Sequence, residues 1–163
     1  MDQLKRSFPP AVDERTRLLV LGSLPGEESL ARQQYYANPR NQFWRLMEAV
    51  IERPLVALRY EERLASLREA GVGLWDTIGS ARREGSLDAS IRDVNRNDLE
   101  SLVARLPALR AVAFNGGKSA ALGLKQLAAR PDLTLIPLPS SSPALTLPFE
   151  EKLARWKALR EHL

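Results

Sequence analysis

The sequence predicts an α/β protein: a three-layer α/β/α arrangement with a central, mainly parallel four-stranded sheet. Short apolar runs alternate with longer stretches in which apolar residues recur at helical spacing. Each apolar run ends in a loop of Gly, Ser, Asp or Asn, which is typical of an open sheet whose strands are joined by helices. Because the chain has 163 residues, no internal repeat and no long linker, we expect one domain over residues 1–163.

The four strands are predicted from the apolar runs, and the helices from the spacing between them. The strands are 17–21 (RLLVL), 72–75 (VGLW), 110–114 (RAVAF) and 133–137 (LTLIP). The helices are 27–34, 40–51, 60–70, 98–106, 118–129 and 149–163. The stretch 80–93 is polar and is predicted to be a loop.

Composition excludes several classes of protein. The chain is 44% hydrophobic, which is enough to bury a core, and no apolar run approaches the roughly twenty residues of a membrane span. The N-terminus lacks the apolar segment of a secretory signal, so we expect a cytoplasmic protein. Cysteine is absent and the single histidine is His162, so we expect no metal, no other cofactor and no Cys- or His-based triad. The net charge of +4 permits an anionic partner without establishing one.

Two loops at predicted strand ends are candidates for binding phosphate. The first follows the first strand and contains Gly22, Ser23, Pro25 and Gly26. Its glycines allow close backbone approach, and the next helix offers free N–H groups; the alternative is an ordinary turn. The second, after the fourth strand, is LPSSSPA with Ser140, Ser141 and Ser142. Its hydroxyl groups suit phosphate oxygens, and the alternative is a solvent-exposed turn.

The segment QQYYANPRNQFW gathers aromatic, amide and basic residues. Phe43 and Trp44 lie at core spacing, whereas Tyr35 and Tyr36 precede a proline and could be exposed to stack on a nucleobase. Asn41 either caps the following helix or faces a cleft, and the sequence leaves both possibilities open.

Asp76 ends the second predicted strand, where ligands of open α/β sheets bind. The alternative roles are a helix cap or an ion pair with Arg82 or Arg83. After the third strand, the segment AFNGGKSAA lacks the glycine that a P-loop needs, because Val112 stands at that position.

Taken together, these motifs resemble the uracil-DNA glycosylase superfamily, and above all its hypoxanthine-DNA glycosylase branch, family 6. The resemblance covers about Leu18 to Ala144 and is most specific in GSLPGEESL-x-x-QQYY-x-x-PRN-x-FW. The NQFW segment is similar to NRFW of the mismatch-specific uracil glycosylases, and NGGKSA is similar to their GK-x-A segment. The PSSS segment stands at the place of the second superfamily motif.

The resemblance implies a base-excision repair enzyme that acts on DNA containing deaminated bases, hypoxanthine first and uracil second, without a cofactor. The target base must leave the stack to be cleaved. The resemblance also implies Asn41 as the catalytic residue and Tyr36, Asp76 and Asn115 as base-binding residues. The first-motif loop and the three serines would contact DNA, and Leu145 or Leu147 would act as a wedge unless both pack in the core.

Two departures from the superfamily pattern bear on catalysis. Leu24 stands where relatives carry Asp or Asn to position water, and Leu138 stands where several carry a histidine. Either Asn41 has taken over the water, as the resemblance implies, or the chain is a catalytically inactive nucleic-acid-binding member. Lys118 is the nearest lysine to the motifs, and the resemblance gives it no Schiff-base role, so lyase activity is not expected.

Overall fold

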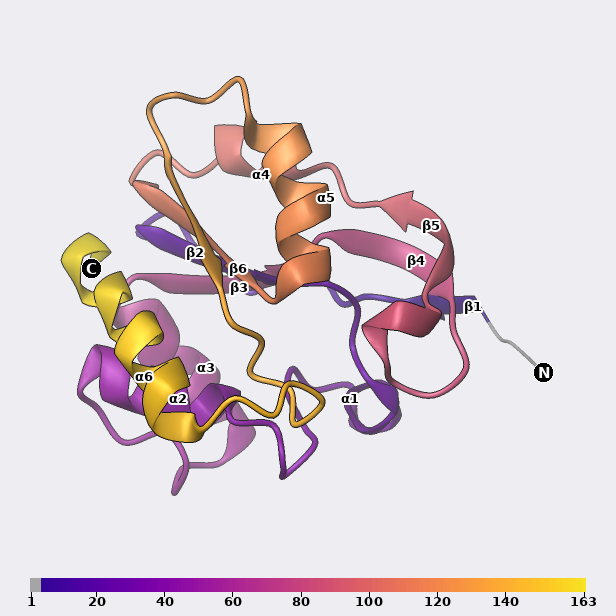
Figure 1. Ribbon diagram of the computed structural model, residues 1–163. Helices are drawn as coiled ribbons and strands as arrows, with labels where there is room; N and C mark the ends of the chain where they lie inside the picture. Colours follow the sequence, from indigo (N-terminus) through magenta and orange to yellow (C-terminus); the bar gives the residue numbers. More distant parts are fainter. Residues whose placement is uncertain (1–3) are drawn as a thin grey trace.

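Four parallel strands form the centre of the computed structural model, which describes residues 4–163 (Figure 1). They are β2 (Leu18–Gly22), β3 (Val72–Asp76), β6 (Ala111–Asn115) and β7 (Thr134–Leu138), in the order β3-β2-β6-β7. All four predicted strands are confirmed to within one residue at each end. Because every pair is parallel, the carboxyl ends of all four strands meet at one edge of the sheet.

Helices cover both faces of this sheet, as the sequence predicts. The helices α2 (Phe43–Ile51), α3 (Tyr60–Glu69) and α6 (Phe149–Trp156) bury one face, and α4 (Leu99–Ala104) and α5 (Gly117–Leu127) bury the other. Alternation along β2 divides the core, because Leu18 and Val20 pack against the first group whereas Leu19 and Leu21 pack against the second. The three-layer α/β/α prediction is therefore confirmed.

All six predicted helices are shorter in the structure, by one to seven residues. The first is α1 (Glu27–Arg32), and α2 begins at Phe43 instead of residue 40. The last helix becomes a 3₁₀ helix over Lys157–His162. None of the helices within residues 4–163 is long and apolar enough to cross a membrane.

A second, antiparallel sheet takes in both ends of the loop predicted over residues 80–93. It contains β1 (Leu4–Arg6), β4 (Ile78–Arg82) and β5 (Arg92–Arg96), with a 3₁₀ turn at Asp88–Ser90. The loop prediction is wrong at its two ends and holds for residues 83–87. It fails at the second end because β5 is largely exposed and polar, so that its pairing with β4 and not an apolar pattern makes it a strand.

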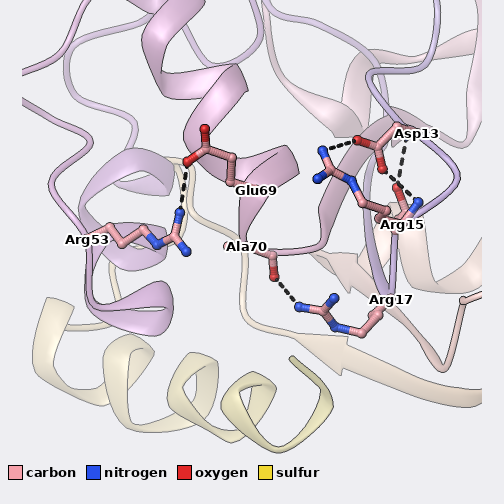
Figure 2. A network of polar contacts seen from close by, with 7 residues as sticks. Asp13, Arg15, Arg17, Arg53, Glu69 and Ala70 are labelled. Carbon is pink, nitrogen blue, oxygen red and sulfur yellow. Dashed lines mark hydrogen bonds and ion pairs between the residues drawn. The ribbon is translucent and has the colours of Figure 1, made fainter.

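Arginines at the amino-terminal edge of the parallel sheet are bonded within the protein (Figure 2). Arg17, just before β2, donates to the Ala70 carbonyl at 3.0 Å, and Arg53 pairs with Glu69 at 3.2 Å. Gly71 separates α3 from β3 at φ +82, and a Cβ there would lie 2.6 Å from the Arg17 guanidinium. These arginines at the amino-terminal edge are thus used in contacts within the protein. The opposite edge of the sheet carries an open cavity.

Candidate functional site

A cavity of about 640 Å³ opens at the carboxyl ends of the parallel strands, within the usual range for ligand sites. Its walls are the β2–α1 loop, the segment before α2, the turn between β4 and β5, and the loop after β7. The residues predicted for the site all line it: Gly22, Ser23, Pro25, Gly26, Tyr36, Asn41, Asp76, Asn115, Ser140, Ser141 and Ser142.

Asp76 contributes a buried carboxyl group to this cavity. The residue is 4% exposed, and its Oδ2 atom has no hydrogen-bond partner within residues 4–163. Burial, and after it the charge of Asp88, raises the pKa of Asp76 to about 7, against a lowering effect of Arg83. Of the alternatives for Asp76, neither a helix cap nor an ion pair with Arg83 is formed among residues 4–163, and Arg82 pairs with Asp93 at 3.7 Å. A buried carboxyl group without a hydrogen-bond partner lowers the stability of the folded protein. Such a group is typical of a ligand-binding site, where the ligand supplies the missing partner.

The absence of a side chain at Gly22 leaves the space that the Asp76 carboxyl group occupies. A Cβ at residue 22 would lie 2.6 Å from Asp76 Oδ1 and 3.0 Å from the Tyr36 hydroxyl oxygen. Since real Cβ atoms do not approach so closely, any other residue at this position would displace one of the two side chains.

Tyr36 lies against α2 and lines the cavity. Its ring stacks on Phe43 with 3.9 Å between the ring centroids and an angle of 13° between the planes. Phe43 therefore covers one ring face, which leaves only the other for a nucleobase. Burial raises the pKa of the Tyr36 hydroxyl, which keeps the group neutral. The expectation that Tyr35 is exposed is wrong: the residue is buried, and its hydroxyl donates to the Pro9 carbonyl at 2.9 Å.

A chain of hydrogen bonds joins Asn115, Ser141 and Asn41. Asn115 accepts from the Ser141 amide through Oδ1 and donates to the Ser141 hydroxyl through Nδ2, both at 2.9 Å. The Ser141 hydroxyl donates in turn to Asn41 Oδ1 at 2.8 Å. Asn115 Nδ2 also donates to the Tyr36 hydroxyl at 3.3 Å, so both of its hydrogens are used within the protein.

Asn41 faces the cavity and also bonds to the start of α2, although the N-cap residue of this helix is Gln42. Its Oδ1 accepts from the Phe43 amide at 3.0 Å at the start of α2, and its side chain also lines the cavity. Because a backbone N–H must be met by an oxygen, this bond fixes which side-chain atom is Oδ1. The Nδ2 group then has no acceptor among the described residues, so Asn41 presents a free donor.

The first-motif loop is bound to the turn between β4 and β5. The Ser23 hydroxyl donates to Asp88 at 2.7 Å, and the buried Arg83 donates to the Pro25 carbonyl at 2.5 Å. The helix that follows is six residues long and begins with Glu27 and Glu28. These carboxylates disfavour a phosphate group at this helix start, and the DNA contact predicted for the loop stays a prediction.

The serine loop is fixed from behind by α6. The buried Lys152 ammonium donates to the Ser142 carbonyl at 3.1 Å, and the Trp156 indole donates to the Pro139 carbonyl at 2.9 Å. Burial lowers the pKa of Lys152. The Ser141 hydroxyl is buried and bonded within the protein, whereas the hydroxyl hydrogens of Ser140 and Ser142 have no acceptor among residues 4–163. These two serines are the ones left free to meet phosphate oxygens.

Comparison with protein families agrees with this architecture. The model of the uracil DNA glycosylase superfamily matches residues 9–163. The chain belongs to this superfamily. The resemblance predicted from the motifs is thereby confirmed.

Relatives within the superfamily are similar over nearly the whole chain. A protein of Methanosarcina acetivorans named hypoxanthine DNA glycosylase is 40% identical over 159 residues, which are 98% of this chain and 99% of that protein. One of Methanosarcina barkeri with the same name is 44% identical over 115 residues, which are 71% of this chain and 73% of that protein. The solution NMR structure of a candidate uracil DNA glycosylase from Methanosarcina acetivorans has a TM-score of 0.87 at 39% identity, and 98% of each chain is covered.

The two departures from the superfamily pattern lie in different places. Leu24 lines the cavity while it packs against Ile78, Ala81 and Ile91. Leu138 instead packs into the core beneath α2 and α6. The first-motif position therefore presents an apolar surface to the cavity where the resemblance leads one to expect a polar group.

Three charged residues that bond to the loops of the site were not predicted from the sequence. Arg83, Asp88 and Lys152 were not predicted to support its loops, because charged residues are usually exposed and all three lie outside the family motifs. No group of three or more His, Asp and Glu side chains in the described part of the chain is arranged to hold a metal ion.

Proposed function

We propose that this protein is a monofunctional DNA glycosylase that hydrolyses the N-glycosidic bond of deaminated bases in DNA, with hypoxanthine as first substrate and uracil as second. The unpartnered buried carboxyl group of Asp76, in a cavity at the carboxyl ends of the strands, is the observation that carries the proposal. The relatives named hypoxanthine DNA glycosylase support it through identity along most of the chain.

Base recognition follows from the hydrogen-bonding capacity of the cavity. The target nucleotide leaves the stack, which costs least for a mispaired base. Ionised Asp76 accepts the N1–H of hypoxanthine or the N3–H of uracil through its free Oδ2. The uncovered face of Tyr36 stacks on the base. Asn115 supports Tyr36 and the serine loop, and it can donate to a base carbonyl only by giving up one of its two bonds.

Asn41 acts on the water by orientation, because an amide is not a strong base. Its free Nδ2 donates to the water oxygen, and a remaining lone pair of the water attacks C1′ of the sugar. The carbon–nitrogen bond breaks with its electron pair going to the base, the water loses a proton to solvent, and the base takes one up. The products are the free base and an abasic site.

The absence of a lyase step is part of the proposal. No lysine lines the cavity in the region that the structure describes, and Lys118 is only half-buried at the start of α5. A Schiff base with the sugar would need such an amine.

The direct test is incubation with an oligonucleotide containing deoxyinosine, followed by alkali. Strand breaks after alkali, and none without it, would establish a monofunctional glycosylase. Breaks before alkali would contradict the monofunctional assignment. Binding without breaks at either step would instead favour the alternative of a catalytically inactive nucleic-acid-binding protein, for which the apolar Leu24 at the first motif is the supporting observation.

Substitution at Asp76 tests base recognition. Asp76→Asn lets the side chain donate as well as accept, so the ratio of hypoxanthine to uracil excision should change in a protein that remains folded. An unchanged ratio in a folded variant would remove Asp76 from base recognition.

A further inference from the structure

The turn between β4 and β5 carries an exposed leucine at the edge of the active-site cavity. Ser86, Leu87, Asp88 and Ala89 of this turn line the cavity, as does Leu145 of the serine loop. In the view of Figure 1, the β4–β5 turn and the serine loop lie on either side of α1. Leu87 is 56% exposed and Leu145 is 39% exposed. Within residues 4–163 the large apolar side chains that are exposed are Leu4, Val56, Leu87 and Leu145. Two of these four, Leu87 and Leu145, line this cavity.

This turn is held firmly on both sides of Leu87. Next to it, Ser86 accepts from the Glu27 amide at 2.9 Å and Asp88 accepts from the Ser23 hydroxyl at 2.7 Å. Arg83, only 1% exposed, donates to the Gly85 carbonyl at 2.8 Å as well as to the first-motif loop. Burying a guanidinium is expensive, so the order of this turn is maintained at a cost in stability. Leu87 is thus presented on a fixed support and not on a mobile loop tip.

The surroundings of Leu87 determine which part of DNA it can meet. The carboxylates of Glu27, Glu84 and Asp88 outnumber the two cations that pair with them or lie close to them, Lys5 and Arg83, so this turn has no excess of positive charge to attract a phosphate group. An exposed apolar side chain has no favourable interaction with water, whereas contact with the faces of bases removes its apolar surface from water and lowers the free energy. Leucine side chains inserted between base steps are a known way to hold DNA unstacked and kinked.

We propose that Leu87 is a second DNA wedge, which packs against the bases beside the flipped nucleotide from the side of the cavity opposite Leu145. This inference rests on the proposed function, since only an enzyme that extrudes a base needs the gap filled and the neighbouring bases held. Two apolar contacts on either side of the cavity would hold the distorted duplex open while the base is bound.

Three variants test the wedge: Leu87→Ala, Leu145→Ala and, as a matched control, Val56→Ala. Val56 is 44% exposed and does not line this cavity. Single-turnover excision of hypoxanthine is measured from duplex and from single-stranded DNA, with a melting curve for each variant. We expect Leu87→Ala to lower the ratio of duplex to single-strand rates by about fivefold or more, since a single strand has no stack to hold open. Val56→Ala should leave this ratio unchanged.

A second measurement does not depend on catalysis. Duplexes with an abasic site and a fluorescent 2-aminopurine on its 5′ or 3′ side report unstacking when protein binds. Wild-type protein should raise the fluorescence, and Leu87→Ala should lose this rise on one side at equal occupancy. An unchanged rise with Leu87→Ala, or equal slowing of excision from duplex and single strand, would overturn the proposal. If the wild type excises nothing but still unstacks the reporter, the proposed function fails and the wedge stands.

Discussion

Replacing Asp76 by asparagine should stabilise this protein at neutral and alkaline pH, although it removes a group proposed for base binding. The pKa of Asp76 is raised from 3.8 to about 7, chiefly by burial. The folded chain therefore holds the proton more tightly than the unfolded chain between about pH 4 and pH 7. The contribution of Asp76 to stability is fully present below pH 4 and is lost as the pH rises through 7.

The size of the effect follows from the two pKa values. Their difference corresponds to a loss of about 4 kcal/mol by pH 8, as an upper limit. Asparagine has nearly the shape of the neutral acid and cannot ionise. The free energy of unfolding of Asp76→Asn should match the wild type near pH 4 and exceed it increasingly up to about pH 7, with a plateau beyond.

Urea denaturation at each pH unit from 4 to 8 measures this difference by linear extrapolation. Asp132→Asn is the control, because Asp132 is exposed and its pKa is lowered by hydrogen bonds from Arg130. The control should show no gain in stability above pH 6. Parallel curves for the wild type and Asp76→Asn over the whole range would refute the burial argument.

Four further predictions concern base binding and catalysis. Asn41→Ala should slow single-turnover excision by about two to four orders of magnitude at a cost of about 1 kcal/mol in stability, and a rate within about threefold of wild type would reduce Asn41 to a helix cap. Asn41→Asp, which keeps the acceptor and loses the donor, should be nearly as slow, and wild-type rates would refute the donor role of Nδ2. Gly22→Ala should weaken hypoxanthine binding at least about tenfold in a folded protein, because its Cβ displaces Asp76 or Tyr36; unchanged binding would contradict the close approach. The value of kcat/KM should rise about tenfold per pH unit up to about pH 7 and then level, a limb absent in Asp76→Asn, whereas a fall with pH would mean that the neutral acid is active.

The parallel sheet could be predicted because its strands are buried on both faces. Residues Leu18 to Gly22 are all buried, so the strand is a continuous apolar run that can be recognised in the sequence. The β4–β5 pair could not be found in this way. The sequence of β5, RDVNR, has a single apolar residue, and the strand depends on pairing with β4, which itself pairs with the distant β1. Non-local pairing of this kind leaves no periodic signal.

The site could be predicted in its composition but not in its bonding. The position of Asn41 near the cavity follows from its motif, whereas its bond to Ser141, one hundred residues away, depends on the fold. The same holds for Arg83, which the sequence offered only as a partner for Asp76. Instead, its guanidinium bridges the carbonyl groups of Pro25 and Gly85. Hydrogen bonds between loops are set by tertiary placement, which residue type alone does not give.

These hydrogen bonds connect the loops that form the walls of the cavity. Asn115 at the end of β6 holds Ser141, Ser141 holds Asn41, and Asn41 holds the start of α2, so three separate loops share one hydrogen-bonded chain. On the other side, Arg83 and Asp88 tie the first-motif loop to the turn that carries Leu87. Because members of such a chain depend on one another, substitutions within it are coupled and their effects do not add. The apolar Leu24 is compatible with catalysis in this arrangement, since Asn41, the residue proposed to orient water, is supplied from the next loop and is held there by Ser141 of the second motif.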